Sequence, residues 1–245
     1  MNVYDLGVID YVESWRLQEA LATRVRGGEA DALLLLEHPH VYTIGRRGTV
    51  DHITAPLAEL RRLGASVYQV DRGGDVTYHG PGQLVAYPIV DLARRGGDVV
   101  AFVRALEDAI IGVAAGFGVA ARRVEGRTGV WVTLPAGPPA KLAAIGVRVA
   151  RGVTTHGLAL NVNTGLEWFE RMVPCGFPHA VASLERLGVR TSVDAVKPML
   201  ASALADALGV ELSEGGAPAP ARDDEIRADA SVRAAVDLLR EAIPA

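Results

Sequence analysis

The sequence predicts an α+β fold with a mixed, largely antiparallel sheet flanked by helices. Apolar runs short enough for strands cluster in groups, at residues 66–90 and 119–162, and helical patterns are interspersed irregularly between them. A doubly wound parallel fold would instead alternate strand and helix along the chain. No internal repeat is present.

The first half of the chain begins with a strand at residues 1–7 and a helix at about 12–26. Leu17, Leu21 and Val25 recur at intervals of four residues, which places them on one helical face. The continuous apolar run 32–37 is short enough for a buried strand. The other elements of this half are strands at 41–44, 66–70, 76–79 and 83–90, a turn at 45–48 and a short helix near 56–63.

The second half opens with the clearest helical pattern, residues 100–117, which Gly118 ends as a stop signal. Another helix is predicted at 193–208, with Gly209 as the residue after its last turn and Pro198 tolerated near its start. Between these helices the sequence predicts strands near 119–123, 128–133, 142–150 and 156–162, a loop at 135–139 and a short helix near 166–171.

The folded domain is predicted to span residues 1–212. The segment Ser213–Arg222 reads SEGGAPAPAR, a composition typical of a disordered linker. Residues from about 224 to 243 have the pattern of one further helix, so residues 213–245 are predicted to be a linker followed by a helix.

Composition excludes several classes of protein. The 245 residues carry a net charge of −4 and a pI near 5.9, which gives no electrostatic basis for binding nucleic acid or an anionic membrane. No apolar run approaches the roughly 20 residues that span a bilayer, and the N-terminus lacks the pattern of a secretory signal. The single cysteine cannot form an internal disulfide, which fits a reducing cytosol, so a cytoplasmic protein is expected.

The segment from Arg72 to Gln83 (RGGDVTYHGPGQ) is the most informative part of the chain. It holds four glycines and a proline between two apolar runs, 65–70 and 84–90. An ordinary hairpin loop is one explanation. However, the segment also carries arginine, threonine, tyrosine, histidine and glutamine, more polar groups than a turn requires. We therefore predict a concave wall where backbone N–H groups approach a ligand closely.

Lys141 and Lys197 are the only lysines among 25 basic residues. A genome rich in GC explains the preference for arginine, and a retained lysine then suggests a position where arginine fails. Lysine can lose its proton when desolvated, whereas arginine stays charged. Lys197 lies on a helix face, where a solvated charge is expected. Lys141 stands at the head of an apolar strand and is the candidate for chemistry.

Cys175 is either a small buried hydrophobe or a nucleophile. The flanking Pro174 and Gly176 place it in a loop, which favours the nucleophile because a core cysteine usually lies within a helix or strand. A free thiol is only a few per cent ionised at neutral pH, so an active-site cysteine needs a nearby positive charge. Lys141 is the candidate for that charge if the fold brings the two residues together.

Two further segments are rich in small residues, Lys141–Arg148 (KLAAIGVR) and Thr155–Val162 (THGLALNV). Each alone is a strand whose small side chains allow tight sheet packing. The same small side chains would also leave a groove wide enough for an aliphatic chain. The sequence of these segments does not decide between the two.

Taken together, the motifs resemble those of the octanoyltransferase family of protein lipoylation. RGGDVTYHGPGQ, KLAAIGVR, HGLALNV and PCG occur in the order of that family, and LEHPHVYTIGRRG (residues 36–48) resembles its N-terminal motif. The resemblance runs from about residue 34 to 176 and is compatible to about 210. Leu142 is often another aliphatic residue in the family, a tolerable difference.

The resemblance implies the fold of biotin and lipoate protein ligases, an acyltransferase domain over residues 1–212, and no cofactor. It implies transfer of an octanoyl group from octanoyl-acyl carrier protein to a lysine of lipoyl domains in 2-oxoacid dehydrogenase complexes and the glycine cleavage H protein. Cys175 would form the thioester and Lys141 would activate it. The implied acyl-pocket residues are Arg72, Gly73, Gly74, Asp75, Val76, Thr77, Tyr78, His79, Ala144, Ile145, Gly146, Gly157, Leu158 and Ala159.

Three alternatives remain open. An ATP-dependent lipoate or biotin ligase on the same fold would need a triphosphate loop, but residues 112–118 form a helix end, and Cys175 would have no role. A metal enzyme is disfavoured because no His-Glu-x-x-His or Cys-x-x-Cys spacing occurs. His38 and His40 are expected to satisfy loop backbone groups, and His79 and His156 either to line the pocket or to donate hydrogen bonds to the residues that do. A non-catalytic module that binds lipoyl domains would form no stable acyl adduct.

Overall fold

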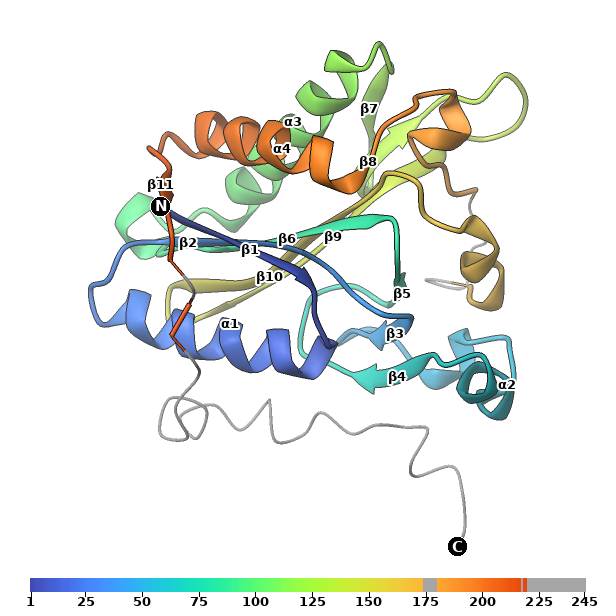
Figure 1. Ribbon diagram of the computed structural model, residues 1–245, viewed down its shortest axis with the longest axis horizontal. Coiled ribbons are helices and arrows are strands. Elements are labelled where there is room, and N and C mark those ends of the chain that lie inside the picture. The colour runs from blue at the N-terminus through green and yellow to red at the C-terminus, as the bar shows by residue number, and fades with distance from the viewer. Residues whose placement is uncertain (174–179, 217, 220–245) are drawn as a thin grey trace, which may run out of the picture.

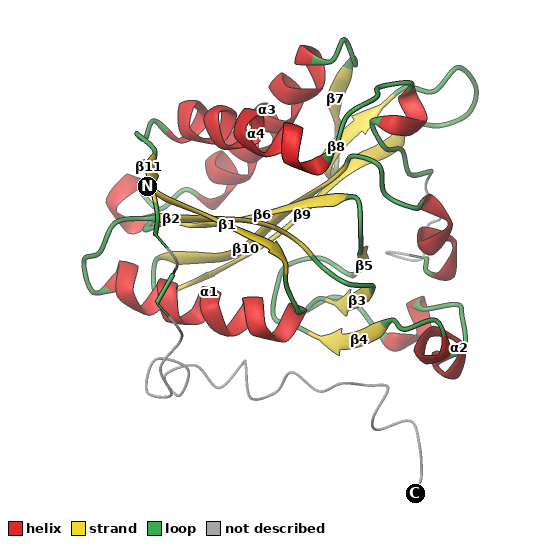
Figure 2. Cartoon of the chain, in the orientation of Figure 1, coloured by secondary structure: helices red, strands yellow, loops and turns green. Residues whose placement is uncertain are grey.

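The computed structural model describes residues 1–173, 180–216 and 218–219. Cys175 and the predicted C-terminal helix therefore lie outside the described residues. The fold consists of one large sheet, one small sheet and helices on both faces of the large one (Figures 1 and 2). Among the described residues, no helix has both the length and the apolar character needed to span a bilayer.

The large sheet has eight strands in the order β11-β1-β2-β6-β10-β9-β8-β7. The strand β1 is parallel to its two neighbours, and every other pairing in this sheet is antiparallel. The predicted mixed, largely antiparallel sheet is therefore confirmed. The strands are β1 (Asn2–Val8), β2 (Ala32–Glu37), β6 (Gln83–Ile89), β7 (Ala121–Val124), β8 (Arg127–Val132), β9 (Ala140–Ala150), β10 (Val153–Asn161) and β11 (Ser213–Glu214).

Three long helices cover the large sheet. The helix α1 (Tyr11–Arg26) packs on one face, and α3 (Val99–Gly116) and α4 (Val193–Leu208) pack together on the other. Both faces are therefore buried, which explains the uninterrupted apolar run of β2. Leu33 and Leu35 join the core beneath α3 and α4, whereas Leu34 and Leu36 join the core beneath α1.

The helix ends follow from the sequence. Asp10 accepts hydrogen bonds from the backbone N–H groups of Val12 and Glu13 at the start of α1, and Asp98 plays the same part for α3. Ser192 caps α4, and Gly209 ends it in the left-handed region with φ of 62°. These caps fix where each helix begins or ends against the sheet.

A small sheet of order β4-β3-β5 lies beside the end of the large one, together with α2 (Leu57–Arg62) (Figure 1). Its strands are β3 (Val41–Ile44), β4 (Ser66–Gln69) and β5 (Val76–His79). One face of this sheet, with Tyr42, Ile44 and Tyr78, forms its own core with Trp168 and Phe169 of the short 3-10 helix Leu166–Arg171. The other side of β5 faces the large sheet.

The hairpin between β9 and β10 is longer than the sequence predicts. Residues 151–155 were expected to connect two shorter strands, but β9 runs to Ala150 and β10 begins at Val153. The turn is only Arg151 and Gly152, with φ of 50° and 83°. Two positive φ values are typical of a type I′ hairpin turn. The sequence does not predict this turn because its first position usually holds Asn, Asp or Gly and not arginine.

Lys197 is not the solvated charge that the sequence suggests. Its side chain is buried between α4 and β1, with Nζ 2.8 Å from Asp5 Oδ1 and 2.9 Å from Asp194 Oδ1. Burial acts to lower the pKa of Lys197. The hydrogen bonds that its ammonium donates to the two carboxylates outweigh burial and raise the pKa. A compact ammonium bound by two carboxylates accounts for this lysine.

The predicted linker also begins later than expected. Ser213 and Glu214 form β11, which pairs in parallel with Asn2 and Val3 of β1. Beyond it, Gly215 N–H donates to Val3 O. Two residues of strand carry too little apolar pattern to be recognised in a stretch of Ser, Glu, Gly and Pro.

Candidate active site

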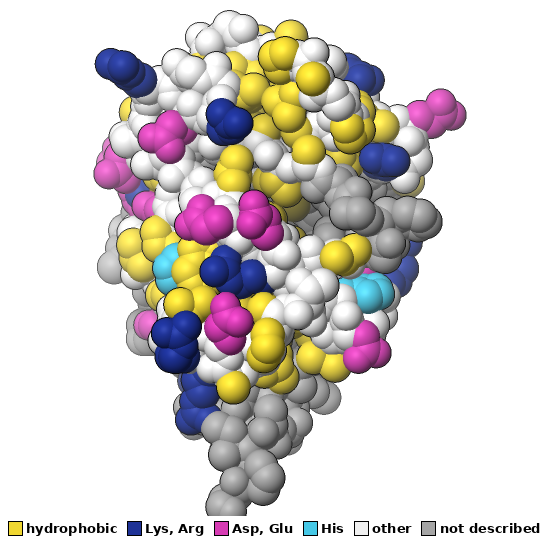
Figure 3. Space-filling model, turned by 90° about the vertical axis from the view of Figure 1, so that its right-hand side faces the viewer, with side chains coloured by type: hydrophobic (Ala, Val, Ile, Leu, Met, Phe, Trp, Pro, Cys, Tyr) yellow, Lys and Arg dark blue, Asp and Glu magenta, His cyan; other side chains and the backbone are white. Residues whose placement is uncertain are grey.

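A narrow pocket lies between the two sheets, with about 30 Å³ of space for water-sized molecules. Its walls come from β5, β6, β9 and β10 of the two sheets, from the 3-10 helix Leu166–Arg171 and from the segment after residue 179. The lining residues are Val76, Thr77, Gln83, Lys141, Ala144, Asn161, Phe169 and Val181. On the face of the molecule that carries the small sheet, acidic, basic and hydrophobic side chains are interspersed (Figure 3).

Lys141 enters the pocket from the start of β9. Its backbone N–H donates to Ala180 O (2.8 Å), and its carbonyl accepts from Ala182 N–H (2.9 Å). Its ammonium lies 4.7 Å from the centre of the Trp131 ring. Ala180 comes five positions after Cys175, so the described chain resumes directly beside Lys141.

Before residues 174–179, the described chain ends at Val173, next to the small sheet. Val173 N–H donates to His52 O (2.8 Å), and Met172 forms a bridge with Ile53. The described residues that flank 174–179 therefore lie beside a loop next to the small sheet on one side and beside Lys141 on the other.

The Gly-rich loop reaches across to β9. The buried guanidinium of Arg72 donates to Thr43 Oγ1 (3.1 Å) and Thr43 O (2.6 Å), and Gly73 N–H donates to Val147 O (3.0 Å). A Cβ at Gly146 would lie 2.9 Å from Gly73 O and 3.2 Å from Arg72 Cδ. Glycine at position 146 thus allows the loop to pack closely against β9.

A buried polar network holds this loop from behind. His156, in the left-handed region with φ of 58°, donates through Nε2 to Asp71 Oδ1 (2.8 Å) and through its backbone N–H to Gln18 Oε1 (2.7 Å). Arg148 binds the second Asp71 oxygen at 2.9 Å. The positive φ of a non-glycine residue is a strained conformation that these contacts maintain. His156 therefore fixes the residue that precedes Arg72 and does not itself line the pocket.

Asp75 and Tyr78 are not among the residues that line the pocket. Asp75 accepts from Val76 N–H (2.6 Å) and pairs with His52 Nδ1 at 2.7 Å. The Tyr78 hydroxyl lies 2.7 Å from His40 Nδ1, and its ring stacks on Trp168. His40 thus pairs with a tyrosine hydroxyl and not with the loop backbone group expected of it.

A chain of directed hydrogen bonds forms part of the pocket wall. Gln83 Nε2 donates to Tyr78 O (3.2 Å) and Asn161 Oδ1 (2.9 Å), which leaves Gln83 Oε1 to accept from His79 Nδ1 (2.8 Å). Asn161 Nδ2 donates to Ala182 O (3.0 Å). Burial lowers the pKa of His79 well below its ordinary value, so its ring is neutral. The Gly-rich loop is thereby linked to the segment that binds Lys141.

Sequence reasoning missed Asn161 as a site residue. The signal was present, because an asparagine that ends the apolar run Leu158–Leu160 must find partners in a buried strand. Phe169 was also missed, since an aromatic residue in a short helix is indistinguishable from a core residue in sequence.

The remaining predicted pocket residues divide between the two faces of the large sheet. Ala144 lines the pocket and pairs with Ala159 across the hairpin, whereas Ile145 and Leu158 pair with one another and pack into the core beneath α3 and α4. Gly157 lies against β6, where a Cβ would be 2.2 Å from Ala86 O. Of the residues predicted for the site, the structure gathers Val76, Thr77, Lys141 and Ala144 around the pocket. Gly73, Gly74 and Gly146 lie beside Arg72, and neither this group nor His79 is among the lining residues.

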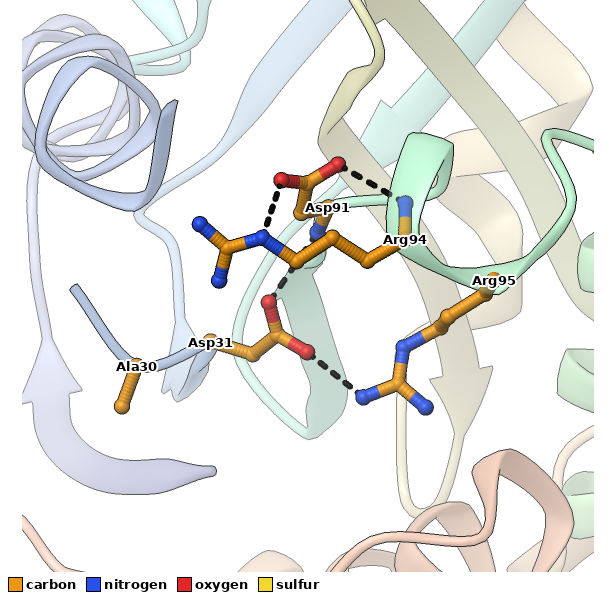
Figure 4. A pocket seen from close by; sticks show the side chains of 5 residues that line it. All are labelled: Ala30, Asp31, Asp91, Arg94 and Arg95. Atoms are coloured by element: carbon orange, nitrogen blue, oxygen red, sulfur yellow. Dashed lines mark hydrogen bonds and ion pairs between the residues drawn. The ribbon is translucent and has the colours of Figure 1, made fainter. Parts of the chain in front are cut away.

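A second pocket, of about 360 Å³, lies near the start of β2 and is lined by Ala30, Asp31, Asp91, Arg94 and Arg95 (Figure 4). Asp31 pairs with Arg95 and Asp91 pairs with Arg94, each at 2.8 Å. Each charge in this pocket is therefore neutralised by its neighbour, and we take the Lys141 pocket as the candidate active site.

Histidines in the described part of the chain serve as hydrogen-bond partners. His38 lies 2.7 Å from Ile9 O and 2.9 Å from the Tyr87 hydroxyl, so it does satisfy a loop carbonyl as expected. Within residues 1–173, 180–216 and 218–219, no group of three His, Cys, Asp or Glu side chains is arranged to hold a metal ion.

His38 makes the stability of the fold depend on pH. Burial lowers its pKa from 6.5 to about 4, and burial also lowers the pKa of His79 and His156. The unfolded chain then binds protons that the folded chain does not, so the free energy of unfolding falls as pH drops from 6.5 toward 4. His38 alone is expected to remove about 2 kcal/mol between pH 7 and pH 5. Urea unfolding at the two pH values measures the loss, and His38→Gln, although less stable at pH 7, should show a shallower pH dependence; an unchanged dependence would contradict the assignment.

Comparison with known proteins agrees with the motifs. Residues 10–205 match the family model described as the lipoyl protein ligase A/B catalytic domain. The chain is 52% identical over 192 residues to an octanoyltransferase of Solibacter usitatus, covering 78% of this chain and 85% of that protein. It is 50% identical over 230 residues to an octanoyltransferase of Nocardia farcinica, covering 91% and 85%.

Among solved structures, lipoate-protein ligase A with bound ATP superimposes with a TM-score of 0.73 at 18% identity, over 93% of this chain and 92% of that one. At this level of identity the similarity concerns the fold alone. It confirms the architecture that the motifs implied.

Proposed function

Because this chain belongs to the lipoyl protein ligase A/B catalytic domain family, and proteins that share about half of its sequence are octanoyltransferases, we propose that it moves an octanoyl group from octanoyl-acyl carrier protein to a lysine of a lipoyl domain. The acceptors are the lipoyl domains of 2-oxoacid dehydrogenase complexes and the glycine cleavage H protein. Cys175 carries the octanoyl group as a thioester between the two half-reactions, and Lys141 is its acid–base partner.

One observation supports this assignment most strongly. The backbone of Lys141 is hydrogen-bonded to Ala180 and Ala182, directly after the segment that contains Cys175, and its side chain enters a pocket lined by both apolar and uncharged polar residues. A lysine at such a position can exchange a proton with a thiol of that segment. The aliphatic chain of the substrate would lie against the apolar side chains of this pocket, Val76, Ala144 and Phe169.

The first half-reaction transfers the acyl group to the enzyme. The Lys141 amine accepts the thiol proton of Cys175, and the thiolate attacks the thioester carbonyl of the donor. The tetrahedral intermediate collapses as the carbon–sulfur bond to the carrier breaks, and the Lys141 ammonium returns the proton to the departing thiolate. One thioester replaces another, so no ATP is needed.

The second half-reaction transfers the acyl group to the acceptor. The neutral amine of the lipoyl-domain lysine attacks the Cys175 thioester, the bond to sulfur breaks, and a proton passes from the attacking nitrogen by way of Lys141 to the sulfur. An amide is more stable than a thioester, so this step is downhill.

Intact-mass spectrometry tests the proposal. The enzyme is incubated with octanoyl-acyl carrier protein in the absence of ATP, and we expect one octanoyl adduct on Cys175 that disappears when a lipoyl domain is added. A parallel reaction contains free octanoate, ATP and the lipoyl domain. Transfer only in the second reaction would identify an ATP-dependent ligase and overturn the thioester pathway, and binding of a lipoyl domain without transfer in either would identify a non-catalytic module.

Lys141→Arg is expected to keep the charge and the fold but to slow acylation of Cys175 about a hundredfold, at the low end of the range for lost acid–base catalysis. The reason is that arginine cannot accept the thiol proton at neutral pH. Single-turnover acylation followed by mass spectrometry measures the rate. Lys197→Arg is the matched control, since that lysine pairs with Asp5 and Asp194 behind α4, and its rate should equal that of the wild type. A wild-type rate in Lys141→Arg would show that the positive charge alone suffices.

A further inference from the structure

We propose that Trp131 is a positioning residue for this reaction, whose indole face holds the Lys141 side chain in the pocket in its protonated form. The inference rests on the proposed role of Lys141 and extends it to a residue outside the motifs. It concerns the protonation state of Lys141 before substrate binds, and not only the shape of the site.

The geometry places the aromatic ring at the cation. Trp131 on β8 pairs directly with Lys141 on β9, and the ammonium lies 4.7 Å from the ring centre. A cation within about 6 Å of an indole centroid is attracted by the negative face of the ring, and Trp is the strongest such partner. The attraction acts on the ammonium and not on the neutral amine.

The ring itself is fixed in place. Trp131 is 2% exposed, and its indole Nε1 donates to Arg127 O at 3.2 Å. The pairing of β8 with β9 shifts register between Val130 and Trp131. This irregularity allows the ring to lie beside the lysine that it pairs with.

The helix α3 is hydrogen-bonded to β8. Gly129 N–H donates to Glu107 Oε1 at 3.0 Å, and Gly129 has φ of 110°. A Cβ at Gly129 would be 2.6 Å from Ala143 O and 3.7 Å from Lys141 Cε. Glutamate 107 is in turn bound by Arg104 (2.6 Å) and Arg123 (2.8 Å). Gly129 and Glu107 thus hold β8 in its place next to β9.

Among the described residues, the charged groups near the Trp131–Lys141 pair include Arg127 and Glu107. Arg127 also lies over the Trp131 ring, at 5.6 Å, and Glu107 behind Gly129 is neutralised by its two arginines. The other side chains that line the pocket, from Val76 to Val181, are uncharged. Stabilising the ammonium favours the thiolate–ammonium pair over the thiol–amine pair, so the nucleophile is ionised before substrate arrives.

The test uses the fact that Cys175 is the only cysteine. Iodoacetamide reacts with the thiolate, so the pH dependence of alkylation reports how readily the sulfur ionises. Trp131→Leu keeps apolar bulk but removes the π face, and alkylation at pH 7 is expected to be about 3–10-fold slower, with its midpoint moved to higher pH. Trp131→Phe should restore part of the rate. A role in packing alone would lower thermal stability and leave the midpoint where it is.

Two further arms separate the possible failures. Lys141→Met should move the alkylation midpoint further than Trp131→Leu does. If Lys141→Met leaves the midpoint unchanged, the proposed lysine–cysteine pair itself is wrong. If Lys141→Met moves it and Trp131→Leu does not, only the role of Trp131 is overturned. Should Trp131→Leu fail to fold, Trp131→Phe decides alone, and alkylation at the wild-type rate across the pH range would overturn the inference.

Discussion

Cys175→Ser is expected to lower the rate of octanoyl transfer by more than about a thousandfold. A serine hydroxyl is far less acidic than a thiol, so the Lys141 amine that ionises a cysteine cannot ionise the serine to any useful extent. The hydroxyl is also a much poorer nucleophile in its neutral form. The variant should still bind the donor, because the side chains that line the pocket are unchanged.

Steady-state transfer to a lipoyl domain measures the loss, and intact-mass spectrometry should show no adduct. Cys175→Ala provides the control, since it removes the nucleophile entirely, and its rate should match that of the serine variant within the background. A serine variant that retained a tenth of the wild-type rate would mean that the acyl group reaches the acceptor without a covalent intermediate on this residue.

Gly157→Ala has the largest expected effect on stability, a loss of about 3 kcal/mol or more. The added Cβ would lie 2.2 Å from Ala86 O and 2.8 Å from Pro88 Cδ, in the middle of the large sheet. Backbone atoms of a paired strand cannot give way as the end of a flexible side chain can. The sheet must open locally between β6 and β10, which also disturbs the strand that ends at Asn161.

Urea unfolding at pH 7 measures this loss, and Gly112→Ala in α3 is the matched control. Nothing lies within 4 Å of a Cβ at Gly112, and alanine is the better helix former, so the control should gain about 0.5–1 kcal/mol. A loss below about 1 kcal/mol for Gly157→Ala would show that the strands can adjust to the methyl group.

The helices and most strands follow from the sequence because their patterns are local. The apolar run 32–37 predicts a buried strand, and the helical pattern at 100–117 predicts α3, and both elements are present. The α+β architecture follows from the order of such segments. The turn at Arg151–Gly152 was missed because its conformation is imposed by the pairing of two long strands, and not by the residue at its first position.

The candidate site was predictable in part. The motifs predicted Lys141, Ala144, Val76 and Thr77, and the structure places all four around one pocket. Which face of the sheet a residue occupies depends on register shifts and on the positive φ of His156, neither of which leaves a sequence signal. The contacts of Trp131 and Lys197 were not predicted for another reason. An aromatic residue in a strand usually packs in the core, and a lysine on a helix is usually a solvated charge.

The position of β11 has a consequence for the order in which the chain folds. Its two residues pair with the outer edge of β1, yet they are synthesised about two hundred residues after that strand. During translation the backbone of Asn2 and Val3 therefore waits without its final partner, as an open strand edge able to pair with another nascent chain. The domain closes its boundary only when nearly all of its polypeptide is available.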